Sequence, residues 1–309
     1  MRAYAPASVG NWIAGFDVLG AALAPLDGSL WGDVVTVRPG TGRLEATGPY
    51  ASRLPPRSSE NLVLQSAALY AEAIGRPLEV DLVLHKGLPL CSGLGSSAAS
   101  VVAALVAMEG WYDGALGPQS LLALAGQAEA LVSGSVHLDN VGPAMRGGLQ
   151  LCIGSQECQT LPWPADWHLA VVHPDILVPT AQARAALPDR IPLKQAVGYW
   201  QNLATLVHAL HVEDTRLIAA CMRDGIIEAA RQRFVPGFVA AQQGAMAAGA
   251  AGCSLSGSGP SMIAVVPEAV DGEAVLAALA APFCEQDIAV TAKLCTLDRV
   301  GSRLLPGDA

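Results

Sequence analysis

The strongest constraint on the fold is a glycine- and serine-rich loop between a short alternating segment and a long apolar one. Residues 79–85 alternate polar and apolar side chains as a half-buried strand does, and residues 97–111 are apolar enough for a buried helix. The loop at residues 89–99 reads Pro-Leu-Cys-Ser-Gly-Leu-Gly-Ser-Ser-Ala-Ala. Glycines let the backbone approach a ligand closely, and the free N–H groups at a helix start favour phosphate. We therefore expect a phosphate-binding loop, with a tight turn closed by a serine N-cap as the alternative.

The spacing of this loop differs from two common nucleotide-binding motifs. It lacks the G-x-x-x-x-G-K-[ST] of a Walker A loop, and it lacks the G-x-G-x-x-G of a dinucleotide fingerprint. An ordinary P-loop NTPase or dehydrogenase is therefore disfavoured. Ser97 lies nearest the helix and is the candidate for reaching a Mg²⁺ ion on phosphate oxygens. The candidate phosphate-binding residues are Pro89, Leu90, Cys91, Ser92, Gly93, Leu94, Gly95, Ser96, Ser97, Ala98 and Ala99.

Composition and charge narrow the class of protein. The chain has 309 residues, of which 52% are hydrophobic and 15% charged, and this suffices for two packed lobes. Its formal net charge of −9 disfavours nucleic acid and anionic membrane as partners. No run reaches the roughly 18 apolar residues of a membrane span. The seven cysteines are scattered and never spaced C-x-x-C, so we expect reduced thiols in a cytoplasmic protein.

The chain changes character at Pro162 and Pro164, which bracket an exposed-looking joint. This predicts two domains, residues 1–163 and 164–309. Strands and helices are mixed without regular βαβ spacing, which favours an α+β class over a doubly wound sheet. Expected strands cover residues 34–38, 79–85, 169–172 and 261–266, and expected helices cover 61–74, 97–111, 119–133, 180–186, 194–210, 215–221 and 238–248.

Three segments together resemble the GHMP kinases, the superfamily of galactokinase, homoserine kinase, mevalonate kinase and phosphomevalonate kinase. The loop at residues 89–99 is similar to their second motif, P-x-x-x-G-L-G-S-S-A-A. Ala-Pro-Ala-Ser at residues 5–8 with Gly-Phe-Asp-Val-Leu-Gly at 15–20 resembles the form found in homoserine kinases, and residues 252–261 resemble the C-terminal motif. Val-Gly-Asn at residues 9–11 stands where that family usually has S-A-N, and the asparagine is kept.

This resemblance implies a two-lobed GHMP kinase fold, with an N-terminal nucleotide lobe and a C-terminal ferredoxin-like α/β sandwich lobe. It implies that ATP lies against the loop and that the acceptor lies in the cleft between the lobes. The implied reaction is transfer of the γ-phosphate of ATP, with Mg²⁺, to the hydroxyl of L-homoserine, which gives O-phospho-L-homoserine in threonine biosynthesis. Family habit also implies a homodimer.

The resemblance assigns catalytic roles to three residues. Glu129 would be the Mg²⁺ carboxylate that this family pairs with the loop serine, Ser97. Without the resemblance, Glu129 would read as a solvated charge on a helix face. Asn140 stands where mevalonate kinases place an aspartate as base, and an amide cannot accept a proton as a carboxylate can. We therefore expect catalysis by alignment and electrostatic stabilisation, with Asn140 bonded to the acceptor hydroxyl.

An amino-acid acceptor carries a carboxylate and an ammonium, so its site should offer arginine to the first and oxygen acceptors to the second. Arg184 and Arg231 match the substrate arginines of the family. Asn11 and Asp17 would face the ammonium end. Each arginine taken alone would read as a solvated surface charge.

Other residues in the matched segments have less defined roles. The resemblance places His137 at the substrate, while His137 and Asp139 can equally form a metal pair, a dyad or a loop-stabilising pair. Lys86 and Thr180 recur near the phosphates in relatives, although a lysine at a strand end is usually just solvated. Asn61 belongs to a segment that lies near the adenine base in relatives, and helix capping alone would also explain it.

Three other hypotheses remain open. Another GHMP kinase, of mevalonate type, would use the same nucleotide lobe for a different acceptor, but Asn140 and the paired arginines count against it. A non-catalytic metabolite sensor would keep the fold without turnover, and the intact Ser97, Glu129 and Asn140 favour an enzyme. A nucleic-acid-binding module is disfavoured because Lys and Arg total 18 against 27 Asp and Glu.

Overall fold

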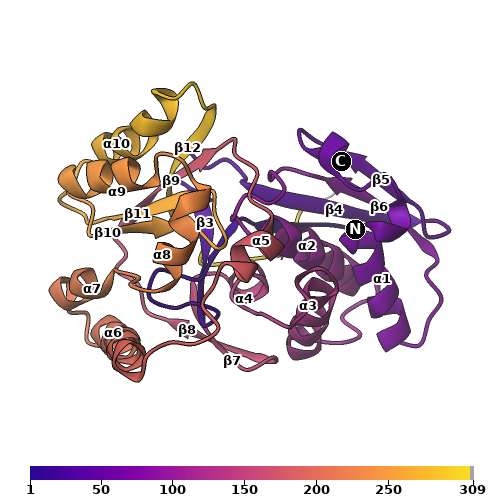
Figure 1. Ribbon diagram of the computed structural model, residues 1–309. Coiled ribbons are helices and arrows are strands. Elements are labelled where there is room, and N and C mark those ends of the chain that lie inside the picture. The colour runs from indigo at the N-terminus through magenta and orange to yellow at the C-terminus, as the bar shows by residue number, and fades with distance from the viewer. Residues whose placement is uncertain (307–309) are drawn as a thin grey trace.

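A computed structural model describes residues 1–306 of the chain, with positions 132 and 133 described by their backbone alone. Within this range the strands form two sheets and helices pack on both (Figure 1). The first sheet has five strands in the order β13-β1-β4-β6-β5. They are β1 (Arg2–Pro6), β4 (Gly32–Pro39), β5 (Leu44–Thr47), β6 (Val80–His85) and β13 (Arg303–Leu304). β4 pairs antiparallel with β1 and β6, whereas β5 pairs parallel with β6.

The helices of the first half, of which α1, α2 and α3 lie on the right of Figure 1 and α4 near its centre, pack against this sheet and one another. α2 lies against β1 and β4, and its buried side chains are mostly alanine, serine and valine, so the helix approaches the sheet closely. This contact fixes the start of α2, where the glycine-rich loop ends. The helices are α1 (Leu62–Ala73), α2 (Ser96–Trp111), α3 (Pro118–Ser133) and α4 (Val141–Arg146), with short 3₁₀ turns at Ala51–Arg53 and Ser58–Glu60.

The second sheet has eight strands and joins the two halves of the chain. Its order is β10-β11-β9-β12-β3-β7-β8, and β2 pairs with β3 beside this path. β3 pairs with β12 through Leu23 and Leu297, so a strand from the start of the chain lies next to one from its end. The strands are β2 (Ser8–Gly10), β3 (Leu19–Pro25), β7 (Leu149–Ile153), β8 (Glu157–Leu161), β9 (His168–Pro174), β10 (Gly252–Leu255), β11 (Met262–Val266) and β12 (Val290–Leu297).

The helices of the second half lie on the left of Figure 1, except α5, which lies near the centre. α9 and α10 pack on β9 to β12, where Phe238 and Phe283 are fully buried in a second hydrophobic cluster. This four-stranded part of the sheet with its two helices forms the expected α/β sandwich. The helices are α5 (Thr180–Ala185), α6 (Leu193–His211), α7 (Thr215–Cys221), α8 (Ile227–Arg231), α9 (Phe238–Ala247) and α10 (Gly272–Cys284), with a 3₁₀ turn at Gln232–Phe234.

The arrangement confirms the predicted α+β class and its two lobes. We propose that the lobes divide between residues 163 and 164, in the connection between β8 and β9. Two strands from the end of the chain pair with strands from its start: β12 pairs with β3, and β13 pairs with β1. Among residues 1–306, no helix combines the length and apolar character needed to cross a bilayer.

Candidate active site

The candidate phosphate loop, residues 89–99, lies between β6 and α2 and is shaped by two glycines with left-handed backbone angles. Gly93 has a φ of 78°, and Gly95, the N-cap residue of α2, has a φ of 61°. A Cβ at Gly95 would lie 1.9 Å from Ser8 Oγ, and one at Gly93 would lie 2.2 Å from the carbonyl oxygen of Ser256. Both positions require glycine, because the loop is packed against two other segments and a side chain would collide with them.

Those two segments are the N-terminal motif and the C-terminal glycine-rich turn. The Ser8 N–H donates to the Leu94 carbonyl at 3.1 Å, and Ser256 Oγ donates to the Gly93 carbonyl at 2.6 Å. The three motifs singled out in the sequence therefore meet at one place in the fold. This convergence defines the candidate active site.

Lys86 lies beneath the loop rather than on its ligand-facing side. Its ammonium donates to the Asp33 carboxylate, to the Ser96 carbonyl at 2.7 Å and to Ser100 Oγ at 2.9 Å, and the residue is only 1% exposed. Asp33 also accepts the Gly87 N–H at 2.9 Å. Lys86 was expected near the phosphates. In the structure its ammonium instead bridges β4 and the first turn of α2.

The alternation of β6 explains this placement. Val80, Leu82 and Leu84 point into the core, and the next inward position along the chain is residue 86. Its buried partner, Asp33, stands near the start of β4. The alternation was visible in the sequence, but the partner on a distant strand was not.

Ser97 and Glu129 come together at the start of α2. Ser97 Oγ donates to Glu129 Oε1 at 2.7 Å, across from α3. Burial raises the pKa of the Glu129 carboxyl, and the Ser97 hydrogen bond and the charge of Lys86 partly oppose that rise. A hydroxyl and a carboxylate at a helix N-terminus are oxygen donors suited to a Mg²⁺ ion on phosphate oxygens. Among residues 1–306, no three His, Cys, Asp or Glu side chains are grouped to hold a metal by themselves.

Asn140, the residue before α4, faces the phosphate loop. Its Oδ1 accepts a hydrogen bond from Ser8 Oγ at 3.0 Å, and its amide lies so close to Gly10 that a Cβ there would be 2.2 Å from Nδ2. The amide Nδ2 can only donate, so Asn140 can offer a hydrogen bond to an oxygen but cannot take up a proton as a carboxylate can. The geometry agrees with a residue that orients an oxygen and does not remove a proton.

Asp139 is 3% exposed and turns toward the backbone of the N-terminal motif. Its Oδ2 accepts the Asn11 N–H at 2.9 Å. Burial raises the pKa of Asp139 to about 7, the nearby charge of Asp17 raises it further, and the Asn11 hydrogen bond opposes the rise. The carboxyl therefore stabilises the loop that carries Asn11 and is partly protonated near neutral pH.

This raised pKa predicts a specific pH dependence of stability. Between pH 3.8, the ordinary pKa of the group, and about pH 7, Asp139 is protonated in the folded state and ionised in the unfolded state. The contribution of Asp139 to the free energy of unfolding should therefore fall as pH rises through this window, by at most about 1.4 kcal/mol per pH unit. Urea denaturation of the wild type and Asp139→Asn at about pH 5 and about pH 8 should show the variant relatively more stable at the higher pH. Parallel pH curves for the two proteins would contradict this assignment.

Asp17, Arg184 and His137 form a cluster of ionisable side chains around the N-terminal motif. Arg184 Nη2 lies 2.9 Å and Nη1 3.4 Å from the two Asp17 oxygens, and His137 Nδ1 lies 3.6 Å from Asp17 Oδ2. Asn11 Oδ1 accepts the Asp17 N–H at 2.9 Å, and both residues have left-handed φ angles. Burial lowers the pKa of His137, Arg184 lowers it further, and Asp17 opposes the shift. Four predicted substrate residues are thus brought together.

Arg231, the fifth predicted substrate residue, is 3% exposed and lies beside the Phe16 ring, near which Arg184 of this cluster also lies. Its Nε donates to the Ala183 carbonyl at 3.3 Å and its Nη1 to the Gly257 carbonyl at 3.0 Å. The Cζ atoms of Arg231 and Arg184 lie 5.2 and 5.9 Å from the ring centroid of Phe16. Two guanidinium groups therefore converge around one aromatic ring.

Thr180 and Asn61 occupy element starts. Thr180 begins α5, and its Oγ1 lies 3.5 Å from Ser258 Oγ in the C-terminal turn. Asn61 is the N-cap of α1, is 5% exposed, and accepts the Val63 N–H at 3.0 Å. The side chain of Asn61 therefore has a capping role in this structure.

Phe16, Tyr199 and Ser8 belong to the site but were not predicted. Tyr199 Oη accepts the Phe16 N–H at 3.1 Å and so supports the loop from α6. Phe16 and Ser8 lie inside the N-terminal motif, so that motif was the available signal. For Tyr199 there was no local signal, because α6 mixes polar and apolar residues along its length.

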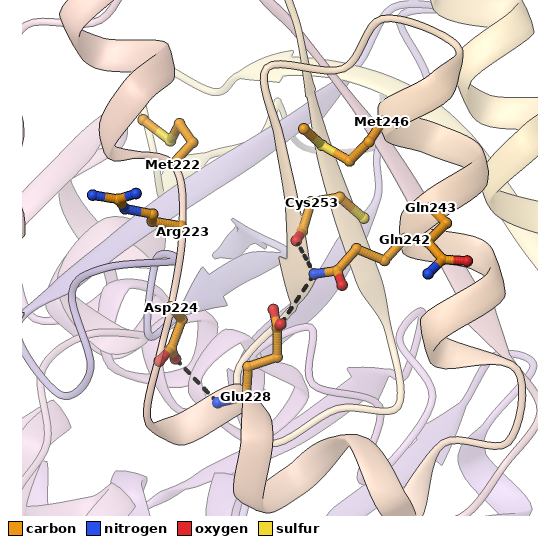
Figure 2. Close-up of a pocket in the computed structure, with 8 residues that line it drawn as sticks. All are labelled: Met222, Arg223, Asp224, Glu228, Gln242, Gln243, Met246 and Cys253. Atoms are coloured by element: carbon orange, nitrogen blue, oxygen red, sulfur yellow. Dashed lines mark hydrogen bonds between the residues drawn. The ribbon is translucent and has the colours of Figure 1, made fainter.

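A cavity of about 380 Å³ lies beside this site, between α8, α9 and β10 (Figure 2). None of its lining residues was predicted as a site residue. They are Met222, Arg223, Asp224, Glu228, Gln242, Gln243, Met246 and Cys253.

Comparison with known proteins agrees with this geometry. The family described as GHMP kinases N terminal domain matches residues 61–148, and GHMP kinases C terminal matches residues 206–283. The structure of a homoserine kinase from Cytophaga hutchinsonii is similar at 36% identity and a TM-score of 0.92, over 99% of this chain and 97% of that chain. A putative homoserine kinase from Listeria monocytogenes (22% identity, TM-score 0.75, 99% of both chains) and a mevalonate kinase from L. major in complex with R-mevalonate (17%, 0.69, 96% of both chains) share the fold.

The fold and its similarity to known GHMP kinases show an ATP-dependent kinase that acts on a hydroxyl group. The chain belongs to the GHMP kinase family.

Proposed function

We propose that this protein is a homoserine kinase, which transfers the γ-phosphoryl group of ATP to the side-chain hydroxyl of L-homoserine. The product is O-phospho-L-homoserine, an intermediate of threonine biosynthesis. Full-length similarity to a homoserine kinase structure supports this proposal. The observation that carries it is the cluster of Asp17, Arg184 and Arg231 beside Asn140, because it offers opposite charges to the two ends of an amino acid.

The Asp17–Arg184 ion pair suggests how the substrate is recognised. When homoserine binds, its carboxylate would pair with Arg184 in place of Asp17. Its ammonium would pair with Asp17 in place of Arg184, and would also contact Asn11. Arg231 supplies a second donor, since its Nη2 makes no hydrogen bond with the residues that the structure describes. A zwitterion can satisfy both partners at once, whereas a hydroxy acid or a sugar leaves one of them unpaired.

Phosphoryl transfer depends mainly on alignment and charge neutralisation. The loop N–H groups and the start of α2 would bind the phosphates, with Thr180 at the other side of the cleft. Ser97 and Glu129 would hold a Mg²⁺ ion, which neutralises phosphate charge when it is bound. Asn140 Nδ2 would hydrogen-bond the acceptor oxygen and aim it at the γ-phosphorus, and no side chain is assigned as a general base.

We also propose a cytoplasmic location, a homodimer and contact of the α1 segment around Asn61 with adenine.

Acceptor specificity tests this proposal. Initial rates of ADP formation with MgATP should be compared for L-homoserine, homoserinol, which lacks the carboxylate, and 4-hydroxybutanoate, which lacks the ammonium. Loss of either charged group should lower kcat/KM by about a hundredfold or more. Mevalonate, galactose and a reaction without acceptor serve as controls. Faster turnover of mevalonate or galactose would place the protein elsewhere in the family, and ATP binding without turnover of any acceptor would favour a sensor.

A further inference from the structure

Arg231 is carried by α8, a helix of only five residues. A helix this short has almost no stability of its own, so its position must be set by contacts with its surroundings. Its end is held through Arg231, which donates to two carbonyl groups. Two carboxylates, Asp224 and Glu228, hold its start and its middle (Figure 2).

Asp224 caps α8 from outside the helix. Its Oδ1 accepts the N–H groups of Ile226 and Ile227 at 2.8 and 2.9 Å, and its Oδ2 accepts the Glu228 N–H at 3.2 Å. The N-cap residue itself, Ile226, has no side chain that can accept these bonds. Asp224 therefore supplies the cap that the local sequence lacks, and its charge also favours the positive end of the helix.

Glu228 joins the middle of α8 to the second sheet. Its Oε2 accepts Ser254 Oγ of β10 at 2.7 Å, and its Oε1 accepts Gln242 Nε2 of α9 at 3.0 Å. The same Gln242 nitrogen donates to the Cys253 carbonyl at 2.8 Å (Figure 2). Glu228 therefore fixes the distance of α8 from β10 and α9 of the C-terminal lobe.

The charges around α8 are consistent with this arrangement. Arg231 is buried, and no carboxylate among the described residues lies within ion-pair distance of it. Burial raises the pKa of the Asp224 carboxyl, while its backbone hydrogen bonds and the charge of Arg231 oppose the rise. Burial lowers the pKa of Arg231 and the charge of Arg184 lowers it further, whereas the charges of Asp17, Asp224 and Asp139 oppose this shift. Asp224 therefore stabilises Arg231 in two ways. It caps the helix that carries Arg231, and its negative charge favours the charged form of the guanidinium.

We propose that Asp224 and Glu228 are positioning residues. They hold α8 in a fixed position, so that Arg231 already faces the place of the substrate carboxylate before the substrate binds. This inference rests on the proposed function, in which Arg231 binds that carboxylate. Preorganisation of this kind lowers the ordering cost of binding, so its loss weakens substrate affinity and leaves the chemical step in place.

Asp224→Asn tests this role. The variant should raise KM for L-homoserine about tenfold, while kcat and KM for ATP change by less than about twofold. Glu228→Gln, which keeps one acceptor oxygen and loses the charge, should raise the same KM less. Asp271→Asn is the matched control: Asp271 caps α10 by accepting the Glu273 and Ala274 N–H groups, away from the site. It should lower the melting temperature without a change in the KM for homoserine.

Two further measurements separate positioning from general destabilisation. In an Arg231→Lys background, Asp224→Asn should add little to KM, because both changes act through the same guanidinium. Hydrogen exchange of the amides at residues 226–231 should be faster in Asp224→Asn than in the wild type, with no substrate present. The inference would be overturned if the effects of Asp224→Asn and Arg231→Lys on the KM for homoserine were fully additive. It would also be overturned if this KM did not change in Asp224→Asn. A wild type that does not phosphorylate homoserine would instead refute the proposed function, and the exchange experiment would still report on α8.

Discussion

Replacing Glu129 by glutamine is expected to lower kcat on the order of a hundredfold, because the start of α2 would lose the carboxylate that we propose balances a Mg²⁺ ion on the phosphates. The amide keeps the size of the side chain and can still accept from Ser97, whose Oγ lies 2.7 Å from Glu129 Oε1. Since burial raises the pKa of Glu129, the neutral variant should be at least as stable as the wild type at neutral pH. Steady-state rates at a series of Mg²⁺ concentrations would measure the loss.

Glu109→Gln is the control for this experiment. Glu109 is a glutamate of the same lobe that accepts the Leu116 and Gly117 N–H groups, at 3.2 and 2.6 Å, and so has a structural role. Its variant should lose stability but keep the Mg²⁺ dependence of the wild type. If Glu129→Gln also kept that dependence and its rate, the metal role of Glu129 would have to be abandoned.

The largest effect on stability is expected for Lys86→Met. Methionine fills the volume of the lysine stem but leaves the buried Asp33 carboxylate without its cation, which should cost about 3–5 kcal/mol of unfolding free energy. The Ser96 carbonyl and Ser100 Oγ would also lose a donor. Urea denaturation of the variant would measure the change.

Two companion proteins make this result specific. The double variant Asp33→Asn with Lys86→Met removes both charges and should recover much of the lost stability. Lys293→Met breaks the exposed pair with Asp27 and should change stability little. A Lys86→Met protein as stable as Lys293→Met, or a double variant no better than the single one, would contradict a stabilising ion pair under the loop.

The helices and strands with clear local signals were predicted well from the sequence. α1 begins at its Asn61 cap and α3 begins at Pro118, each within a residue of the expected start. Many elements were not predicted, among them β3, β12, α4, α8 and α10. β3 consists of glycine, alanine, leucine and proline, is buried along nearly all of its length and shows no alternation, and α10 contains Pro282, which interrupts the helical pattern. Its Asp271 cap was the signal that was available.

The resemblance to the family named the residues of the site, but their contacts could not be predicted. Ser97 and Glu129 are in adjacent helices, and their pairing agrees with what the resemblance implies. The Asp17–Arg184 pair joins residues 167 positions apart, and nothing local in either segment indicates it. The inward turn of Lys86 likewise depends on Asp33, which stands on another strand. Pairings of this kind are set by tertiary packing, so they appear only in the folded structure.

The most direct test of the central claim follows the phosphoryl group itself. The protein is incubated with ATP labelled at the γ-phosphate, Mg²⁺ and L-homoserine, and the labelled products are separated and identified. We predict that the label appears in O-phospho-L-homoserine in a one-to-one ratio with ADP. Label that stays in ATP or appears only in inorganic phosphate would contradict the assignment of this chain as a homoserine kinase.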